Sequence, residues 1–163
     1  MSKNQINKKI DLQHLKLKAA NFCAYQERSV LEVKQKLQKL GANQAQTTQV
    51  IDDLVNEGFI DESRFARVYA NGKLAQNKWG KHKIAHALQQ KGINKTLVDE
   101  ALAGLDEKKY LHTLSKLIEK KNREVKETDL WIRKNKIAQS VSLKGFEADL
   151  IFQEIDEMLK SER

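Results

Sequence analysis

The sequence predicts an all-α protein made of three tandem three-helix repeats that form an elongated, curved array. Composition favours helices, because the 163 residues contain only 7 glycines and 0 prolines, which disfavours a turn-rich β protein. An internal repeat is the second observation. Gly41, Gly92 and Gly145 follow similar apolar patterns and are spaced roughly 50 residues apart, a period typical of arrays whose units bury their apolar faces partly on their neighbours.

Each of these glycines follows an apolar pair at positions i and i+4, the stripe of a helix that ends in a glycine. The pairs are Val33 and Leu37, Ile84 and Leu88, and Ile137 and Val141. Ile93, Leu97, Val98 and Leu102 after the second glycine match Phe146, Leu150, Ile151 and Ile155 after the third. After Gly41 the apolar residues Val50 and Leu54 come three residues later, which predicts a longer loop with the sequence ANQAQTT.

A further helix is expected before each pair. In the first repeat it covers about residues 12–27, and Ser29 with Glu32 forms a capping box at the start of the next helix. Asp61 and Asp106 are expected to cap the corresponding helices of the second and third repeats, the former reaching about Asn77. The predicted parts are a flexible N-terminus over residues 1–11 and repeats over 12–60, 61–105 and 106–163. A single irregular bundle with coincidental glycines is the less favoured alternative.

The motifs of common enzyme and membrane-protein classes are missing from the sequence. No segment approaches the roughly 20 apolar residues that cross a bilayer, and the N-terminus lacks an apolar signal core, so we expect a cytoplasmic protein without membrane contact. Cys23 stands alone and is expected to be a small buried hydrophobe. His82 and His86 have a metal-like spacing but lack the intervening glutamate of a zinc motif. Glycine-rich phosphate loops and nucleophile elbows are also missing, which favours a protein that is not an enzyme.

The formal net charge of +8 is concentrated in residues 63–98. This segment contains eight lysines and arginines and no aspartate or glutamate, so the formal charges of the remaining residues sum to zero. Charge of mixed sign is sufficient for solubility, so the lack of carboxylates favours contact with an anion, either nucleic-acid phosphate or the acidic side chains of a protein. A solvated charged face is the alternative. Residues 146–163 have the opposite character, with six acidic and two basic residues.

Six residues of the basic segment are candidate contacts. Arg64, Arg67, Lys78, Lys81 and Lys83 are expected to bind anions, and Trp79 either stacks on a base or packs between two helices. Gly80 is expected to be an N-cap, which places Lys81 and Lys83 in the first helical turn, where cations oppose the helix dipole at a cost of ~0.3–1 kcal/mol each. An anionic partner would reverse this penalty, because unpaired backbone N–H groups are also expected there.

Two stretches carry a specific resemblance. GFIDESRFA (residues 58–66) and WGKHKIAHALQQKGI (residues 79–93) are similar to the two distinctive motifs of the RecX family of bacterial recombination regulators. RSVLEV (residues 28–33) resembles the start of the family's first repeat, and KNKIAQSVSLKGFEADLI follows the same plan more loosely. The sequence departs from the family in the longer loop after Gly41 and in a long charged link, KKNREVKETD, between the first two helices of the third repeat.

The resemblance implies a modulator of the RecA recombinase that acts in homologous recombination and DNA repair. RecX-like proteins bind in the groove of the RecA filament on single-stranded DNA and typically hinder its growth, which lowers strand exchange, ATP hydrolysis and co-protease activity. Many also bind DNA directly, and they are not enzymes and need no cofactor. The charge of this chain is equally compatible with a general DNA- or RNA-binding helical adaptor that does not contact RecA. A protein scaffold held by the acidic last helix is a third possibility, and a monomer is the expected state.

Overall fold

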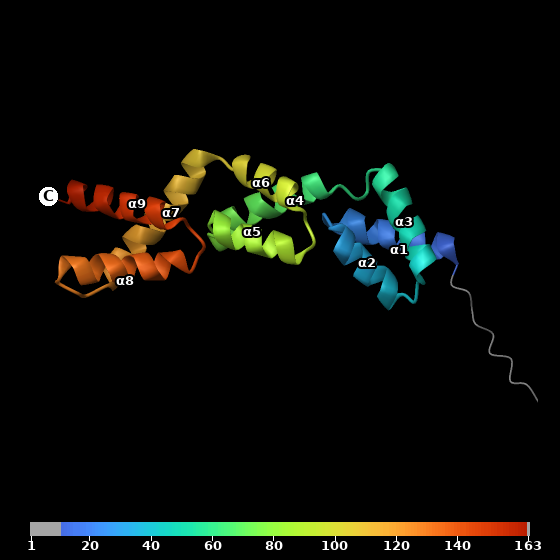
Figure 1. Cartoon of the computed structure of the whole chain (residues 1–163), viewed down its shortest axis with the longest axis horizontal. Helices are drawn as coiled ribbons and strands as arrows, with labels where there is room; N and C mark the ends of the chain where they lie inside the picture. Colours follow the sequence, from blue (N-terminus) through green and yellow to red (C-terminus); the bar gives the residue numbers. More distant parts are fainter. Residues whose placement is uncertain (1–10, 163) are drawn as a thin grey trace, which may run out of the picture. The chain divides into compact units, whose positions relative to one another are not determined.

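The structure, a computed structural model, describes residues 11–162, which form nine α-helices and one π-helical segment and no strand (Figure 1). The helices are α1 (Leu12–Tyr25), α2 (Val30–Lys39), α3 (Gln44–Asn56), α4 (Glu62–Gly72), the π-helical segment η1 (Lys73–Asn77), α5 (Lys81–Gln90), α6 (Lys95–Ala103), α7 (Glu107–Glu124), α8 (Leu130–Ser142) and α9 (Ala148–Ser161). The predicted all-α repeat array is confirmed. The expected flexible N-terminus lies, apart from Asp11, outside the described residues. None of the helices in this part of the chain has the length and apolarity needed to span a membrane.

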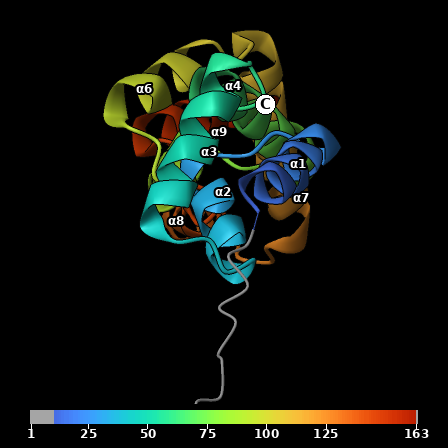
Figure 2. The same ribbon diagram turned by 90° about the vertical axis from the view of Figure 1, so that its right-hand side faces the viewer.

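The chain divides into two compact units, with the boundary between Phe65 and Ala66, and each is described by itself. In unit 1, each of α1, α2 and α3 packs against the other two (Figures 1 and 2). Its core consists of Leu15, Ala19, Cys23, Val33, Leu37, Val50, Leu54 and Ile60. The expected capping box begins α2: the Ser29 hydroxyl accepts from the Glu32 N–H at 3.2 Å, and the Glu32 carboxylate accepts from the Ser29 N–H at 2.9 Å. The predicted buried state of Cys23 is also confirmed, and burial raises the pKa of its thiol to about 11.

The prediction of a longer loop after Gly41 is wrong. Helix α3 begins directly after the N-cap Asn43, two residues beyond its glycine, just as Asn94 caps α6 two residues beyond Gly92. The polar residue Thr47 occupies the first buried position of α3, where the other repeats place an apolar side chain. A prediction that relies on apolar residues therefore places the start of α3 one helical turn too late.

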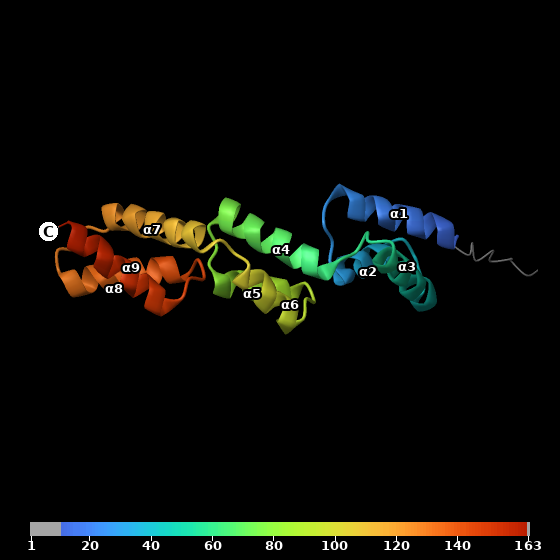
Figure 3. The ribbon, with the colours of Figure 1, turned by 90° about the horizontal axis from the view of Figure 1, so that it is seen from above.

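Unit 2 contains a second three-helix group, in which α7, α8 and α9 all pack against one another, and α5 packs against α6 (Figure 3). The helix that Asp61 was expected to cap does begin at Glu62, and the Asp61 carboxylate accepts from the Arg64 N–H at 3.0 Å. It ends as an α-helix at Gly72 and continues to Asn77 as the π-helical segment η1. The buried residues of this unit include Ala70, Leu74, Ile84, Leu88, Ile93, Val98, Leu105, Tyr110, Leu114, Ile118, Ile137, Val141, Phe146, Ile151 and Ile155.

The start of α5 docks on the turn between α8 and α9 through backbone atoms. The Gly80 N–H donates to the Lys144 carbonyl at 2.8 Å, and the His82 N–H donates to the Gly145 carbonyl at 2.9 Å. A Cβ on Gly80 would lie 2.6 Å from the Gly145 oxygen, and a Cβ on Gly145 would lie 2.5 Å from the Lys83 nitrogen. Gly145 also has φ +95°, so glycine is required at both positions for close approach, and at the second for conformation as well.

A partly buried side-chain network supports the same junction. The Tyr110 hydroxyl accepts from the Lys81 N–H at 2.9 Å and donates to the Glu147 carboxylate. Burial and the hydrogen bond to Glu147 raise the pKa of Tyr110, so the phenol stays protonated at neutral pH. The Tyr110 ring also packs against Phe146, with ring centroids 5.0 Å apart. Residues of the second and third repeats are thus joined within unit 2 by backbone and side-chain hydrogen bonds.

The long charged link predicted in the third repeat is also shorter than expected. The residues KKNRE belong to the last turns of α7, and only residues 125–129 separate α7 from α8. Arg133 fixes this link: its guanidinium donates to the Val125 carbonyl at 2.9 Å, to the Glu127 carbonyl at 3.0 Å and to Asn122. The charged end of α7 resembles a loop in sequence because a solvated helix and a loop have similar composition.

Candidate nucleic-acid interface

Two aromatic rings and three lysines form a cluster in unit 2, which we call the cation–aromatic cluster. Its members are Tyr69 on α4, Lys73 in η1, Trp79 before α5, Lys83 on α5 and Lys91 after it. The ammonium groups of Lys73 and Lys83 lie 4.9 Å and 5.0 Å from the centroid of the Trp79 ring. Lys73 and Lys91 lie 5.3 Å and 5.7 Å from the centroid of Tyr69. The Lys73 ammonium therefore contacts both rings and joins them into one cluster.

The local backbone that builds the cluster is unusual. The wider turn of η1 ends at Lys78, whose φ of 59° is the one positive value of a non-glycine residue in the described chain. A left-handed conformation costs a residue with a Cβ roughly 1–2 kcal/mol. The Lys73 carbonyl accepts the N–H groups of both Lys78 and Trp79, and the Lys78 ammonium donates to the Ala75 carbonyl at 2.7 Å. This reversal turns the chain so that Trp79 lies between lysines of η1 and α5.

The electrostatics of the cluster favour an anionic ligand. In the described residues, neither Lys73 nor Lys83 has a carboxylate within ion-pair distance, and both ammonium groups share the Trp79 ring. The negative face of an aromatic ring offsets part of their mutual repulsion, typically by ~0.5–1 kcal/mol at exposed sites. An anion bound between the two lysines would offset the remainder. Trp79 itself is only partly exposed, and its ring lies close to both ammonium groups.

The start of α5 does not offer the unpaired N–H groups that were expected to bind an anion. The N–H groups of Gly80, Lys81 and His82 donate to the Lys144 carbonyl, the Tyr110 hydroxyl and the Gly145 carbonyl. These donors are occupied by unit 2 itself, so a ligand at this helix start must be bound by side chains. The expected first-turn positions of Lys81 and Lys83 are confirmed, and Gly80 is the N-cap.

The structure distributes the six predicted contact residues unequally. Trp79 and Lys83 belong to the cation–aromatic cluster, and Lys78 is exposed directly beside it. Lys81 points to another ring, with its ammonium 5.0 Å from the Tyr110 centroid. Arg67 is exposed on α4.

The partners of the Arg64 side chain all belong to unit 1. Its Nε lies 2.5 Å from the Glu27 Oε1, and its Nη2 donates to the Gly58 carbonyl at 3.0 Å. A guanidinium with these partners anchors the first turn of α4.

Two members of the cluster, Lys73 and Lys91, were not among the predicted contacts. Lys73 follows Tyr69 by four residues, the spacing at which side chains meet on a helix, and this pair is visible in the sequence. The position of Lys91 depends on how α5 packs and has no local signal.

The fold and the cluster define a class: an all-α protein of tandem three-helix repeats with a basic surface supported by aromatic rings. Two family models match the chain, "RecX, first three-helix domain" over residues 16–54 and "RecX, second three-helix domain" over residues 61–102. The chain is 31% identical over 144 residues to the regulatory protein RecX of Clostridioides difficile, covering 88% of this chain and 68% of that protein. It is 29% identical over 153 residues to the regulatory protein RecX of Bacillus cytotoxicus, covering 94% and 56%.

A solved structure agrees with these sequence matches. The crystal structure of RecX from Lactobacillus salivarius superposes with a TM-score of 0.83 at 27% identity and covers 90% of this chain and 95% of that one. The chain therefore belongs to the RecX family, whose curated members are named as regulatory proteins. It spans between about half and two thirds of the length of the curated relatives that it matches.

Proposed function

We propose that this protein regulates a RecA-type recombinase by binding the filament that RecA forms on single-stranded DNA, and that it slows filament growth. Membership of the RecX family is the observation that carries this proposal. Lower strand exchange, ATP hydrolysis and co-protease activity follow, because each of these activities requires the filament. The protein acts by binding, without catalysis or a cofactor, and as a monomer in the cytoplasm where the filament forms.

The cation–aromatic cluster supports the nucleic-acid part of the proposal. Phosphates attract unpaired lysines in a salt-dependent way, and Lys73 and Lys83 are held in place beside one ring. Because the cluster could bind phosphates without any recombinase, it equally favours the second candidate, a general DNA- or RNA-binding adaptor. The two functions differ in whether RecA activity changes when DNA is in excess.

ATP hydrolysis by the cognate RecA on single-stranded DNA tests the proposal. We expect the wild-type protein to lower the rate, and the double variant Lys73→Gln/Lys83→Gln to lower it less. Lys108→Gln/Lys109→Gln is the matched control, because it removes the same charge from exposed positions at the start of α7. An unchanged ATPase rate at saturating DNA, together with tight binding to naked oligonucleotides, would refute the RecA proposal in favour of the adaptor.

A further inference from the structure

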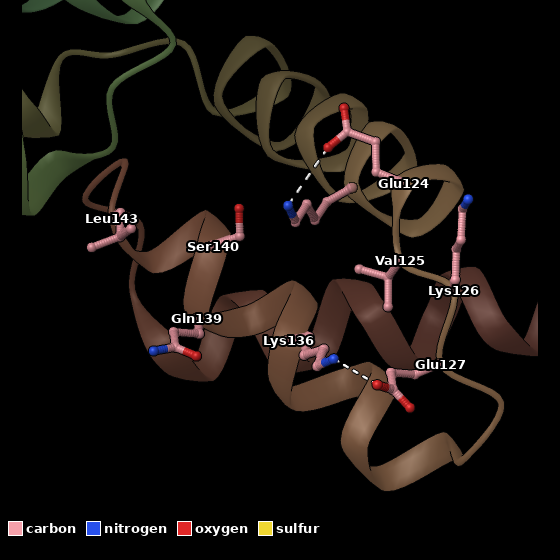
Figure 4. Close-up of a pocket in the computed structure, with 9 residues that line it drawn as sticks. Glu124, Val125, Lys126, Glu127, Lys136, Gln139, Ser140 and Leu143 are labelled. Atoms are coloured by element: carbon pink, nitrogen blue, oxygen red, sulfur yellow. Dashed lines mark hydrogen bonds and ion pairs between the residues drawn. The ribbon is translucent and has the colours of Figure 1, made fainter.

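A groove lies between α7 and α8 in the third repeat. It has a volume of about 580 Å³ and is lined by residues of the α7 end, the link and the outer side of α8 (Figure 4). A second hollow of about 150 Å³ adjoins it and shares Lys121, Glu124 and Ser140 with it. The two hollows form one groove that runs to Lys144, in the turn after α8.

The charges along the groove do not cancel. Two of its lysines are paired: Lys121 lies 3.6 Å from Glu124, and Lys136 lies 2.6 Å from Glu127 (Figure 4). The remaining lysines of the groove, Lys120, Lys126 and Lys144, have no carboxylate within ion-pair distance in the described residues. The groove is therefore basic, although the third repeat as a whole ends in an acidic helix.

One end of the groove touches the residues beside the cation–aromatic cluster. The Lys144 ammonium donates to the Asn77 carbonyl at 3.4 Å, directly before Lys78, and the Lys144 carbonyl accepts from the Gly80 N–H. Lys83, a member of the cluster, approaches Gly145 so closely that no Cβ fits between them. The backbone docking of α5 on the α8–α9 turn thus makes a single basic path, from η1 past Lys144 into the groove.

We infer that this path binds a single-stranded nucleic acid, with the cluster and the α7–α8 groove contacting successive parts of one strand. A flexible polyanion with regularly spaced phosphates fits unpaired lysines that are separated by neutral ion pairs. The exposed side chain of Leu143, which is 75% accessible, and the side chain of Val125 offer apolar surface to bases. The other apolar residues that line the groove, Leu117 and Val141, are half-buried and buried, so the groove lacks the continuous apolar stripe that an acidic helix of a protein would need.

This inference rests on the proposed function for its ligand, but it is tested without RecA. Fluorescence anisotropy measures binding of labelled oligo(dT) of about 4 and about 16 nucleotides, which bracket common single-strand site sizes. The groove variant is Lys120→Gln/Lys126→Gln, at the end of α7 and in the link, and the control is again Lys108→Gln/Lys109→Gln, at the start of α7 and outside the groove. Circular dichroism confirms that each variant is folded.

Loss of two phosphate contacts lowers the slope of log K against log salt by about 1.4 for a single strand. Between 50 and 200 mM salt, the groove variant should therefore lose about 7-fold less affinity for the long oligonucleotide than the wild type does. Binding of the short oligonucleotide, which the cluster alone can hold, should change little. The control should match the wild type at both lengths.

Equal salt slopes for the groove variant and the control would overturn the inference. If the groove variant binds DNA normally but no longer lowers RecA ATPase activity, the groove contacts an acidic protein surface instead, and the inference fails while the proposed function stands. If the groove variant shows the predicted slope but the wild type has no effect on RecA, the inference stands and the proposed function fails.

Discussion

Replacement of Gly80 by alanine tests whether backbone docking holds the second and third repeats together in unit 2. The new Cβ would lie 2.5 Å from the Gly145 carbonyl carbon and 2.6 Å from its oxygen, well inside van der Waals contact. These neighbours are backbone atoms, so a change of side-chain rotamer cannot relieve the clash. The start of α5 must therefore move away from the α8–α9 turn.

The cost of this movement follows from the hydrogen bonds that it breaks. The bonds from the Gly80 and His82 N–H groups to the Lys144 and Gly145 carbonyls contribute ~0.5–1.5 kcal/mol each. Gly80 is also buried, so lengthened bonds leave polar groups without solvent, which adds to the penalty. We expect Gly80→Ala to lower the free energy of unfolding of unit 2 by about 2–4 kcal/mol.

Urea unfolding followed by tryptophan fluorescence measures this loss selectively. Both tryptophans of the chain, Trp79 and Trp131, belong to unit 2, so their emission reports that unit alone. With a slope of ~2 kcal/mol per molar urea, the midpoint should fall by about 1–2 M.

Gly72→Ala is the matched control. Gly72 lies in right-handed helical conformation, and a methyl group added there would meet no atom within 4 Å. Alanine there should stabilise the helix by roughly 0.5–1 kcal/mol. The docking argument is refuted if Gly80→Ala unfolds at the wild-type midpoint, or if Gly72→Ala loses as much stability as Gly80→Ala does.

Three further predictions concern single side chains. Tyr110→Phe keeps the ring against Phe146 but removes the hydroxyl that pairs with Lys81 and Glu147, so unit 2 should lose ~1–3 kcal/mol in the same urea assay, and an unchanged midpoint would contradict this role. Cys23 should react slowly with iodoacetamide at pH 8, because a pKa of about 11 leaves roughly one thiol in a thousand ionised, and the rate should rise steeply as the pH approaches 11; fast alkylation of the folded protein at pH 8 would count against its burial. Arg64→Gln removes the contacts with Glu27 and Gly58, so the alkylation rate of Cys23 should rise about 10-fold for each ~1.4 kcal/mol by which the free energy of unfolding of unit 1 falls. The salt dependence of oligonucleotide binding should stay as in the wild type. A lower slope of log K against log salt would show that Arg64 contacts DNA.

The helices are predictable from the sequence where local signals agree. Ser29 with Glu32 and the aspartate at position 61 mark helix starts through short-range hydrogen bonds, and apolar pairs before the glycines mark helix ends. The start of α3 is not predictable in this way, because the buried polar residue Thr47 breaks the apolar pattern there.

The candidate site is less predictable because it depends on packing between elements distant in sequence. The positive charge of residues 63–98 is visible in the sequence and predicts Trp79 and Lys83 as candidate contacts, and the structure brings these two residues together. The occupied N–H groups at the start of α5 could not be predicted, since their acceptors lie more than 60 residues away at the α8–α9 turn or on Tyr110 of α7. The groove is hidden for the same reason: the charged stretch that holds Lys120, Lys121 and Lys126 is visible in the sequence, but its position beside Lys136 and Lys144 depends on how α7 and α8 pack.

The docking of α5 on the α8–α9 turn has a consequence for how such a protein can evolve. A contact made by main-chain groups does not depend on the identity of most side chains, so the surrounding residues can diverge while the geometry of the contact persists. Only Gly80 and Gly145 are tied to one another, because a methyl group at either position separates the same two backbones. A contact of this kind is compatible with a fold that is shared at 27% identity, because it depends on these two glycines and not on the side chains around them.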